Sequence, residues 1–237
     1  MYYLWYSLAM KYSVIEELLG VTFLDKTKLL TALTHRSYLN EHREAKQEHN
    51  ERYEFLGDAV LELIVTDYLF REYPHKPEGE LTAIRSALVN TVSLADASTR
   101  LGLGDYLLMS KGETKDTGRA RQYLLADVFE AIAGAIFLDQ GYDAARDYIA
   151  RNLFEKTKEI VEKELWKDAK SRFQERAQDK VSITPTYETI RQTGPDHARQ
   201  FVIGAFLGSN LIAEGEGFSK QEAEQVAAER ALAKQNW

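Results

Sequence analysis

The sequence predicts an all-α domain followed by a small α+β domain of order α-β-β-β-α. In the first part, apolar residues recur every three or four positions, as in helices packed on a core; the segments are 14–20, 28–33, 55–70, 81–101 and 125–138. In the last part, after a helical stretch at 170–179, short β-branched and aromatic segments alternate with glycine-bearing turns; they are 184–192, 199–207 and 210–216. A long alanine-rich helix closes the chain. The predicted boundaries are 1–156, a linker at 157–167, and 168–237.

Composition excludes several classes of protein. With 237 residues, 44% of them hydrophobic and 28% charged, the chain is long and apolar enough to fold around a core without cross-links. It has no cysteine, which excludes disulfides, thiolate zinc sites and a cysteine nucleophile, and favours a reducing compartment, the cytoplasm. Its apolar runs are too short to cross a membrane. The net charge of −7 argues weakly against a nucleic-acid partner, but it lies almost entirely before residue 168, which indicates two modules with different roles.

The connections between the predicted helices are marked by polar residues and prolines. The apolar, aromatic stretch 1–10 is interpreted as a structural extension, because no positive charge precedes it and no clean cleavage site follows it. Residues 39–50 and 110–122 are polar enough to form loops, and 155–170 is typical of a solvated helix end that runs into a linker. His35 is expected to be a hydrogen-bonded structural residue.

Two acids stand on the apolar side of the helix predicted at 55–70. Glu54 and Asp58 are four residues apart, so they share a face. At about 100° per residue that face continues through Leu61 and Val65, toward the core. A solvated face is the ordinary interpretation of an acidic pair, but helical phase disfavours it here. Burying ionised carboxylates is costly, so a cation is expected beside them.

The helix predicted at 125–138 repeats this anomaly. Its only charged residues are Asp127 and Glu130, three apart and on one side, where the small Gly134 leaves room. Two stray acids at a surface helix end are the alternative. Four carboxylates on two largely buried helices predict a site for a hard cation, Mg²⁺ with Mn²⁺ as a substitute. Without a metal, their mutual repulsion should raise some of their pKa values.

Three sequence blocks together resemble the ribonuclease III family of double-stranded-RNA endonucleases. They are residues 34–37 (THRS), 51–59 (ERYEFLGDA) and 125–131 (LADVFEA). Two departures are Tyr53, where the family usually has Leu or Met, and 121–123 (RQY), where a Glu-Ser pair is common. Neither departure touches the four carboxylates.

The resemblance implies an all-α endonuclease domain, a set of metal-binding residues and a hydrolysis reaction. Glu54, Asp58, Asp127 and Glu130 would be the Mg²⁺-binding catalytic carboxylates of a hydrolase that leaves 5′-phosphate and 3′-hydroxyl ends in rRNA and mRNA processing. Glu51 and Glu78 match acidic positions that support the site. The family's domain is a homodimer, and Phe55 matches its dimer-contact aromatic residue. Helical phase alone leaves Phe55 equally open to a place in the core.

The stretch 111–121 has a net charge of +2 and two interpretations. It is either a solvated loop or a loop that contacts phosphates and leads into the helix of Asp127.

The tail resembles a double-stranded-RNA-binding domain. The matching residues are Gln174, Glu175 and Gln178 on the first helix, 194–198 (GPDHA) between strands, and 217–225 (GFSKQEAEQ) at the start of the last helix. The resemblance implies RNA contacts by Gln174, Gln178, His197, Ser219 and Lys220. One departure is Gln221, where the family often has a second lysine, a loss that should weaken the salt dependence of binding.

The sequence thus predicts a metal-dependent endoribonuclease acting on double-stranded RNA. A non-cleaving double-stranded-RNA-binding protein that keeps the fold is the alternative, disfavoured because all four carboxylates are present. A phosphohydrolase acting on small molecules would leave the tail unexplained.

Overall fold

The computed structural model describes residues 13–44, 47–115, 117–195 and 199–237. The chain divides into two compact units, and the division between Ile160 and Val161 falls within the predicted linker. The interpretation of residues 1–10 as a structural extension lies outside the described residues. The predicted fold class is confirmed, because the first unit is helical and the second has the order α-β-β-β-α.

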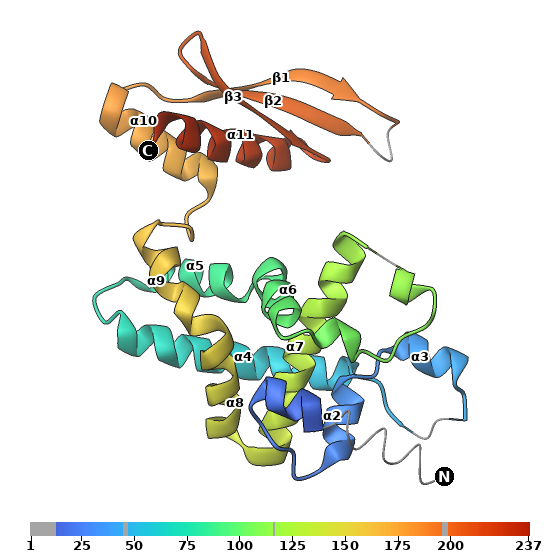
Figure 1. Ribbon diagram of the computed structural model, residues 1–237. Helices are drawn as coiled ribbons and strands as arrows, with labels where there is room; N and C mark the ends of the chain where they lie inside the picture. The colour runs from blue at the N-terminus through green and yellow to red at the C-terminus, as the bar shows by residue number, and fades with distance from the viewer. Residues whose placement is uncertain (1–12, 45–46, 116, 196–198) are drawn as a thin grey trace. The chain divides into compact units, whose positions relative to one another are not determined.

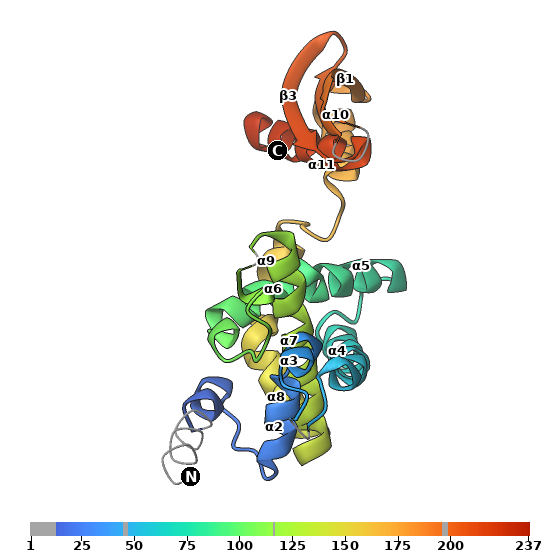
Figure 2. The ribbon, with the colours of Figure 1, turned by 90° about the vertical axis from the view of Figure 1, so that its right-hand side faces the viewer.

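The first unit is built around two long helices, α4 (Glu51–Glu72) and α7 (Arg119–Gln140), which pack against each other (Figures 1 and 2). Shorter helices surround them: residues 13–19, α2 (Lys26–Ala32), α3 (Arg36–Glu41), α5 (Glu78–Val89), α6 (Thr91–Arg100), α8 (Tyr142–Ile149) and α9 (Glu155–Glu162). Two 3₁₀ turns, η1 (Leu103–Asp105) and η2 (Glu113–Lys115), and a π-helical turn, η3 (Ala150–Phe154), complete it.

The position of α7 in the core of this unit explains why its sequence is apolar on every side. Val128, Phe129, Ile132 and Ile136 are completely buried, because α2, α4, α6 and α8 all pack against this helix. A helix covered on all sides needs no polar stripe. Phe129 also stacks on Tyr148 of α8, with ring centroids 4.9 Å apart.

Several predicted boundaries were wrong, each for a local reason. The segment 81–101 is two helices, because Asn90 interrupts it and caps α6 by accepting a hydrogen bond from the Ser93 amide. The loop predicted at 110–122 ends early, since α7 begins at Arg119. The loop predicted at 39–50 overlaps the end of α3, whose first turn is capped by His35. His35 is hydrogen-bonded through Nδ1 to Ser37, which confirms its structural role.

The second unit is a three-stranded antiparallel sheet with two helices packed on it (Figure 1). Its elements are α10 (Ala169–Val181), β1 (Thr186–Thr193), β2 (Gln200–Leu207), β3 (Asn210–Gly217) and α11 (Lys220–Gln235). Phe173 of α10, Ala205 of β2 and Ala227 of α11 are buried together in its core. The alanine-rich face of α11 lies so close to β3 that a Cβ on Gly215 would come within 2.2 Å of the Ala223 carbonyl oxygen.

Across the described ranges, none of the helices combines the length and the apolar character that crossing a lipid bilayer requires.

Candidate functional site

Two glycines bring the backbones of α4 and α7 together where the helices cross. A Cβ on Gly57 would come within 1.8 Å of the Glu130 carbonyl oxygen, and one on Gly134 within 2.3 Å of the Tyr53 carbonyl oxygen. No real Cβ tolerates such distances, so both positions require glycine. This close crossing places the carboxylates of Glu54 and Asp58 beside those on α7.

Three of the four predicted metal-ligating carboxylates form a tight cluster. Glu54, Asp127 and Glu130 each offer an oxygen within 4.8 Å of the others, and all three side chains are half-buried. Asp58 is more exposed and lies outside this closest group. Asp58 is one turn after Glu54 on α4, and its charge contributes to the raised pKa of both Glu54 and Glu130.

The electrostatics of the cluster are those of carboxylates held together without a cation. Burial, followed by the charges of Asp58, Asp127 and Glu54, raises the pKa of Glu130 to about 8. Burial and neighbouring carboxylates raise the pKa of Glu54 as well. The pKa of Asp127 is raised by burial, and only a charge on His35 opposes this. Like charges and desolvation thus act in the same direction at this site.

The donor set fits a hard divalent cation. In the part of the chain that the structure describes, neither lysine nor arginine forms an ion pair with Glu54, Asp127 or Glu130, and every candidate ligand atom is a carboxylate oxygen. Mg²⁺ and Mn²⁺ prefer such oxygen ligands, whereas zinc and copper sites usually include imidazole or thiolate. Half-buried carboxylates without a counter-charge are costly unless a cation neutralises them.

The two acids that the resemblance predicts to support the site lie far apart, because Glu51 begins α4 and Glu78 begins α5. Glu51 is exposed, accepts a 3.3 Å hydrogen bond from Arg36, and contributes to the raised pKa of Glu54. Glu78 is in the first turn of α5 and lines a cavity of about 440 Å³ with Thr66. Thr66 is twelve residues after Glu54 on the same helix, about 18 Å along its axis. Within this chain, therefore, Glu78 lies away from the cluster.

Phe55 is 81% exposed, so it does not lie in the core of the first unit. It begins a stripe of exposed apolar residues along α4 that continues through Leu63, 58% exposed, and Phe70, 70% exposed. Large apolar side chains aligned on one helix face and left in water are typical of a surface that another protein covers.

In the cationic stretch 111–121, the structure gives Arg121 a structural role. Its guanidinium donates to the Gly104 carbonyl oxygen at 3.1 Å and contacts the Met109 sulfur at 3.4 Å, tying the start of α7 to the preceding turns. Lys111 is exposed. Fewer cations of this stretch are therefore available to phosphates than the sequence suggests.

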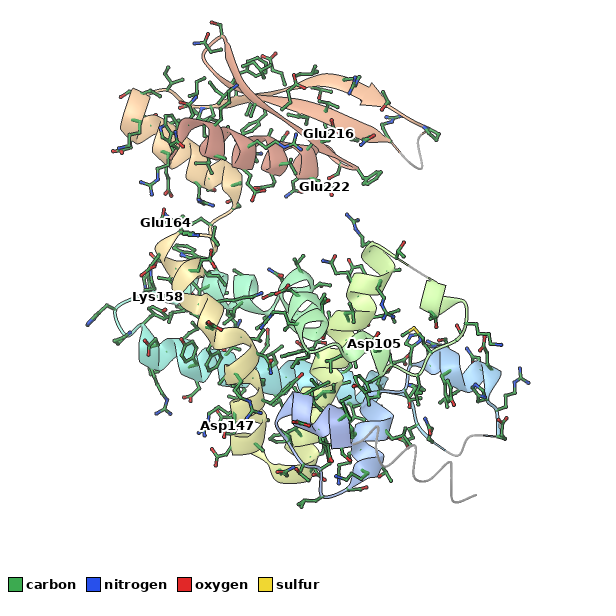
Figure 3. All side chains as sticks on the ribbon, viewed as in Figure 1. Asp105, Asp147, Lys158, Glu164, Glu216 and Glu222 are labelled. Carbon is green, nitrogen blue, oxygen red and sulfur yellow. The ribbon has the colours of Figure 1, made fainter. Side chains whose placement is uncertain are left out.

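The second unit exposes the predicted RNA-contacting glutamines. Gln174 and Gln178 are exposed one turn apart on α10. Ser219 caps α11 by accepting from the Glu222 amide at 3.1 Å, while the Glu222 carboxylate accepts from the Phe218 amide at 2.9 Å. Figure 3 labels Glu222 on this first turn. Lys220, the first residue of α11, is exposed. His197 lies outside the described residues.

The four residues Gln174, Gln178, Ser219 and Lys220 form the predicted RNA-binding surface. Lys170, beside it, was not identified from the sequence. Lys170 precedes Gln174 by four positions on α10, and both line one polar cavity. The four-residue spacing was the available signal, but only the structure shows that the start of α11 borders the same cavity.

Comparison with known proteins agrees with both units. Residues 25–157 match the family model described as ribonuclease-III-like, and residues 169–235 match the double-stranded RNA binding motif. A protein named ribonuclease 3 from Clostridium perfringens is 43% identical over 92% of this chain and 91% of its own length. Another, from Geobacillus kaustophilus, is 44% identical over 94% of this chain and 90% of its own.

A solved structure supports the fold of the first unit. The nuclease domain of ribonuclease III from Campylobacter jejuni, in which a region involved in dimer formation is flexible, has 42% sequence identity and a TM-score of 0.53. The match covers 59% of this chain and 96% of that one. Coverage of both units at this identity, together with the carboxylate cluster, shows that the chain belongs to the ribonuclease III family of double-stranded-RNA endoribonucleases.

Proposed function

We propose that this protein is a Mg²⁺-dependent endoribonuclease that cuts double-stranded RNA to 5′-phosphate and 3′-hydroxyl ends. We assign it to rRNA and mRNA processing in the cytoplasm, where a chain without cysteine needs no oxidising environment. The observation that carries the proposal is the uncompensated cluster of Glu54, Asp127 and Glu130. Mn²⁺ has the same ligand preference and should substitute for Mg²⁺.

The four proposed catalytic carboxylates would hold the cation, and the cation would offset the repulsion between them and the phosphodiester. A bound Mg²⁺ supplies positive charge against the attacked phosphate and lowers the pKa of water. Glu54, Asp127 and Glu130 would be its ligands, and Asp58 would add negative charge from one turn further along α4. Because burial and neighbouring carboxylates raise the pKa of Glu130 to about 8, a cation that binds near neutral pH would displace a proton from this group. Glu51 adds negative charge beside Glu54.

We assign nuclease activity to residues 1–156, a linker to 157–167, and duplex binding to 168–237. Gln174 and Gln178 are exposed at a spacing suited to 2′-hydroxyls and base edges in the minor groove of A-form RNA. Lys220 adds a cation where α11 presents its first amides, and Ser219 fixes that turn. His197 belongs to this proposed set on the sequence resemblance alone.

We also propose that the protein is a homodimer joined through the exposed stripe on α4. A two-fold interface uses the same patch on both subunits. A two-fold axis perpendicular to α4 and close to Leu63 sets the two stripes antiparallel. Phe55 lies eight residues before Leu63, so it would contact the partner subunit's α4 about eight residues after that axis. There each subunit has the cavity of about 440 Å³ lined by Phe70, Leu81 and Arg85. Phe55 would fill this cavity.

This dimer would explain why Glu78 lies far from the carboxylates of its own protomer. Glu78 lines the same cavity, which lies some 18 Å along α4 from the carboxylates of its own protomer. In the antiparallel arrangement, the cavity of one subunit approaches the Glu54 end of α4 in the other. Glu78 would then support the site of the partner subunit and not its own.

Cleavage of a long RNA duplex with and without Mg²⁺ tests the assignment. We expect cutting that requires Mg²⁺ or Mn²⁺, yields 5′-phosphates, and is lost in Glu130→Gln, while RNA binding in Ca²⁺ persists. Glu17→Gln is the matched control, because Glu17 is an exposed acid on the helix of residues 13–19, outside both α4 and α7. Normal cleavage by Glu130→Gln would contradict the site, and binding without cleavage by the wild-type protein would favour the non-cleaving alternative.

A further inference from the structure

A polar cavity of about 500 Å³ lies in the second unit, between the first turn of α10, the start of β1 and the first turn of α11. Its lining is formed by Asp168, Lys170, Ser171, Gln174, Pro185, Tyr187, Gln221 and Gln225. It therefore joins Gln174 of the proposed RNA-binding surface to Gln221 at the start of α11.

Lys170 occupies a fixed place beside that surface. It lies one turn before Gln174 and two turns before Gln178, so the three residues follow one side of α10. The start of the helix is held against α11, because Gln225 Oε1 accepts from the Ala169 amide at 2.9 Å. Gln225 Nε2 also donates to Asp168 at 3.1 Å. The backbone of Lys170 is thus tied down while its side chain reaches the cavity.

The ammonium group of Lys170 is already paired. Its Nζ lies 2.6 Å from Glu224 Oε2 on α11, and the two side chains retain 35% and 24% of their exposure. A pair this accessible can exchange partners with a solvent-borne anion. By contrast, Lys220 has no ion pair within the described ranges. The same surface therefore carries one available cation and one that a carboxylate neutralises.

We propose that Lys170 is a further phosphate-binding residue of the RNA-binding surface, and that Glu224 sets the affinity for RNA by competing with phosphate for the Lys170 ammonium group. The inference builds on the proposed duplex binding by this unit. Lys170 is the cation that lines the same cavity as Gln174 and Gln221.

The competing interpretation is that the pair only fastens α10 to α11. The two interpretations predict opposite effects of Glu224→Gln. The amide keeps the size of the carboxylate and its oxygen still accepts a hydrogen bond from Lys170, but it no longer neutralises the charge. A structural tie would be weakened by this change, so RNA binding would stay constant or decline. Competition would be relieved, so binding would become tighter.

The test measures binding of the full chain to an RNA duplex of about 20 base pairs across a salt series, in Ca²⁺. A single phosphate contact changes the slope of log K against log salt by roughly 0.9, which is about eightfold in affinity between 1 M and 0.1 M salt. Because Glu224 neutralises Lys170 only partly, we expect Glu224→Gln to bind about three- to eightfold more tightly at 0.1 M salt, with a steeper slope. Glu229→Gln is the matched control, because it makes the same charge change on another face of α11.

A second pair of variants links the gain to Lys170. In a Lys170→Gln background, Glu224→Gln should increase the affinity for the RNA duplex no more than Glu229→Gln does. Equal affinities of Glu224→Gln and Glu229→Gln, or a gain that survives without Lys170, would overturn the inference while leaving duplex binding intact. Failure of the wild-type protein to bind the duplex would overturn both.

Discussion

Replacing Glu130 with glutamine should stabilise the metal-free protein while abolishing its activity. In the folded chain, burial and the charges of Asp58, Asp127 and Glu54 raise the pKa of Glu130 from 4.5 to about 8. One unit corresponds to about 1.4 kcal/mol, so the full shift would be roughly 5 kcal/mol. Solvent reaches the half-buried group and screens it, which reduces the expected effect to about 2 kcal/mol.

The sign follows from where the proton is held. The folded state keeps the Glu130 proton up to about pH 8, whereas the unfolded chain releases it near its ordinary pKa of 4.5. The contribution of this group is therefore fully present below about pH 4.5 and is lost as the pH rises to about 8. Glu130→Gln has no such loss. The two proteins should be equally stable in acid and differ most above about pH 8.

Thermal unfolding in EDTA and in Mg²⁺ measures this difference. Near pH 9 in EDTA, the nuclease-domain transition of Glu130→Gln should lie about 4–8 °C above that of the wild-type protein. Saturating Mg²⁺ should raise the wild-type transition more than that of the variant, because the variant has lost a ligand. A variant that is no more stable than the wild-type protein near pH 9 without metal would refute the reasoning about the cluster.

Three further predictions follow from the helix crossing, the exposed stripe and the second unit. Gly134→Ala should lower the free energy of unfolding by about 3 kcal/mol or more and abolish cleavage, because the added methyl group would meet the Tyr53 carbonyl oxygen at 2.3 Å. Gly79→Ala is the control: a Cβ there has nothing within 4 Å, so the free energy of unfolding should change by less than about 1 kcal/mol. Urea unfolding measures both changes. Phe55→Asp should shift the molar mass in sedimentation from dimer to monomer, whereas Leu24→Asp, at an equally exposed leucine outside the stripe, should not; a dimeric Phe55→Asp protein would argue against the proposed interface. Removal of residues 168–237 should weaken duplex binding more than it slows cutting at saturating RNA, and unchanged affinity in a filter-binding assay would contradict the assigned role of the second unit.

Local signals in the sequence were sufficient for the fold class and most elements. Three- and four-residue periodicity located α4, and glycine-bearing turns separated the three strands. The errors occurred where one polar residue decides a boundary. Asn90 divides α5 from α6 through a side-chain cap that periodicity does not register, because the apolar pattern continues on both sides of it.

The candidate site was predictable in its residue types and not in its geometry. Helical phase alone placed Glu54 and Asp58 on one apolar face, and Asp127 and Glu130 on another. That the two faces meet depends on Gly57 against Glu130 and Gly134 against Tyr53, contacts between residues more than seventy positions apart. Helical phase did not anticipate that Asp58 would be more exposed than its three neighbours, because exposure depends on what packs beside a helix.

The crossing of α4 and α7 also explains how the molecule tolerates an unfavourable cluster. Close approach at Gly57 and Gly134 shortens the distance between the helices, and several apolar side chains of both helices near the crossing are buried, among them Ile64, Val65, Ile132 and Ile136. Burying one such side chain contributes about 1.5–3 kcal/mol. A few of these contacts exceed the roughly 2 kcal/mol by which Glu130 disfavours the metal-free state above pH 8. This burial therefore opposes the repulsion within the cluster and favours keeping the carboxylates together where a cation can bind.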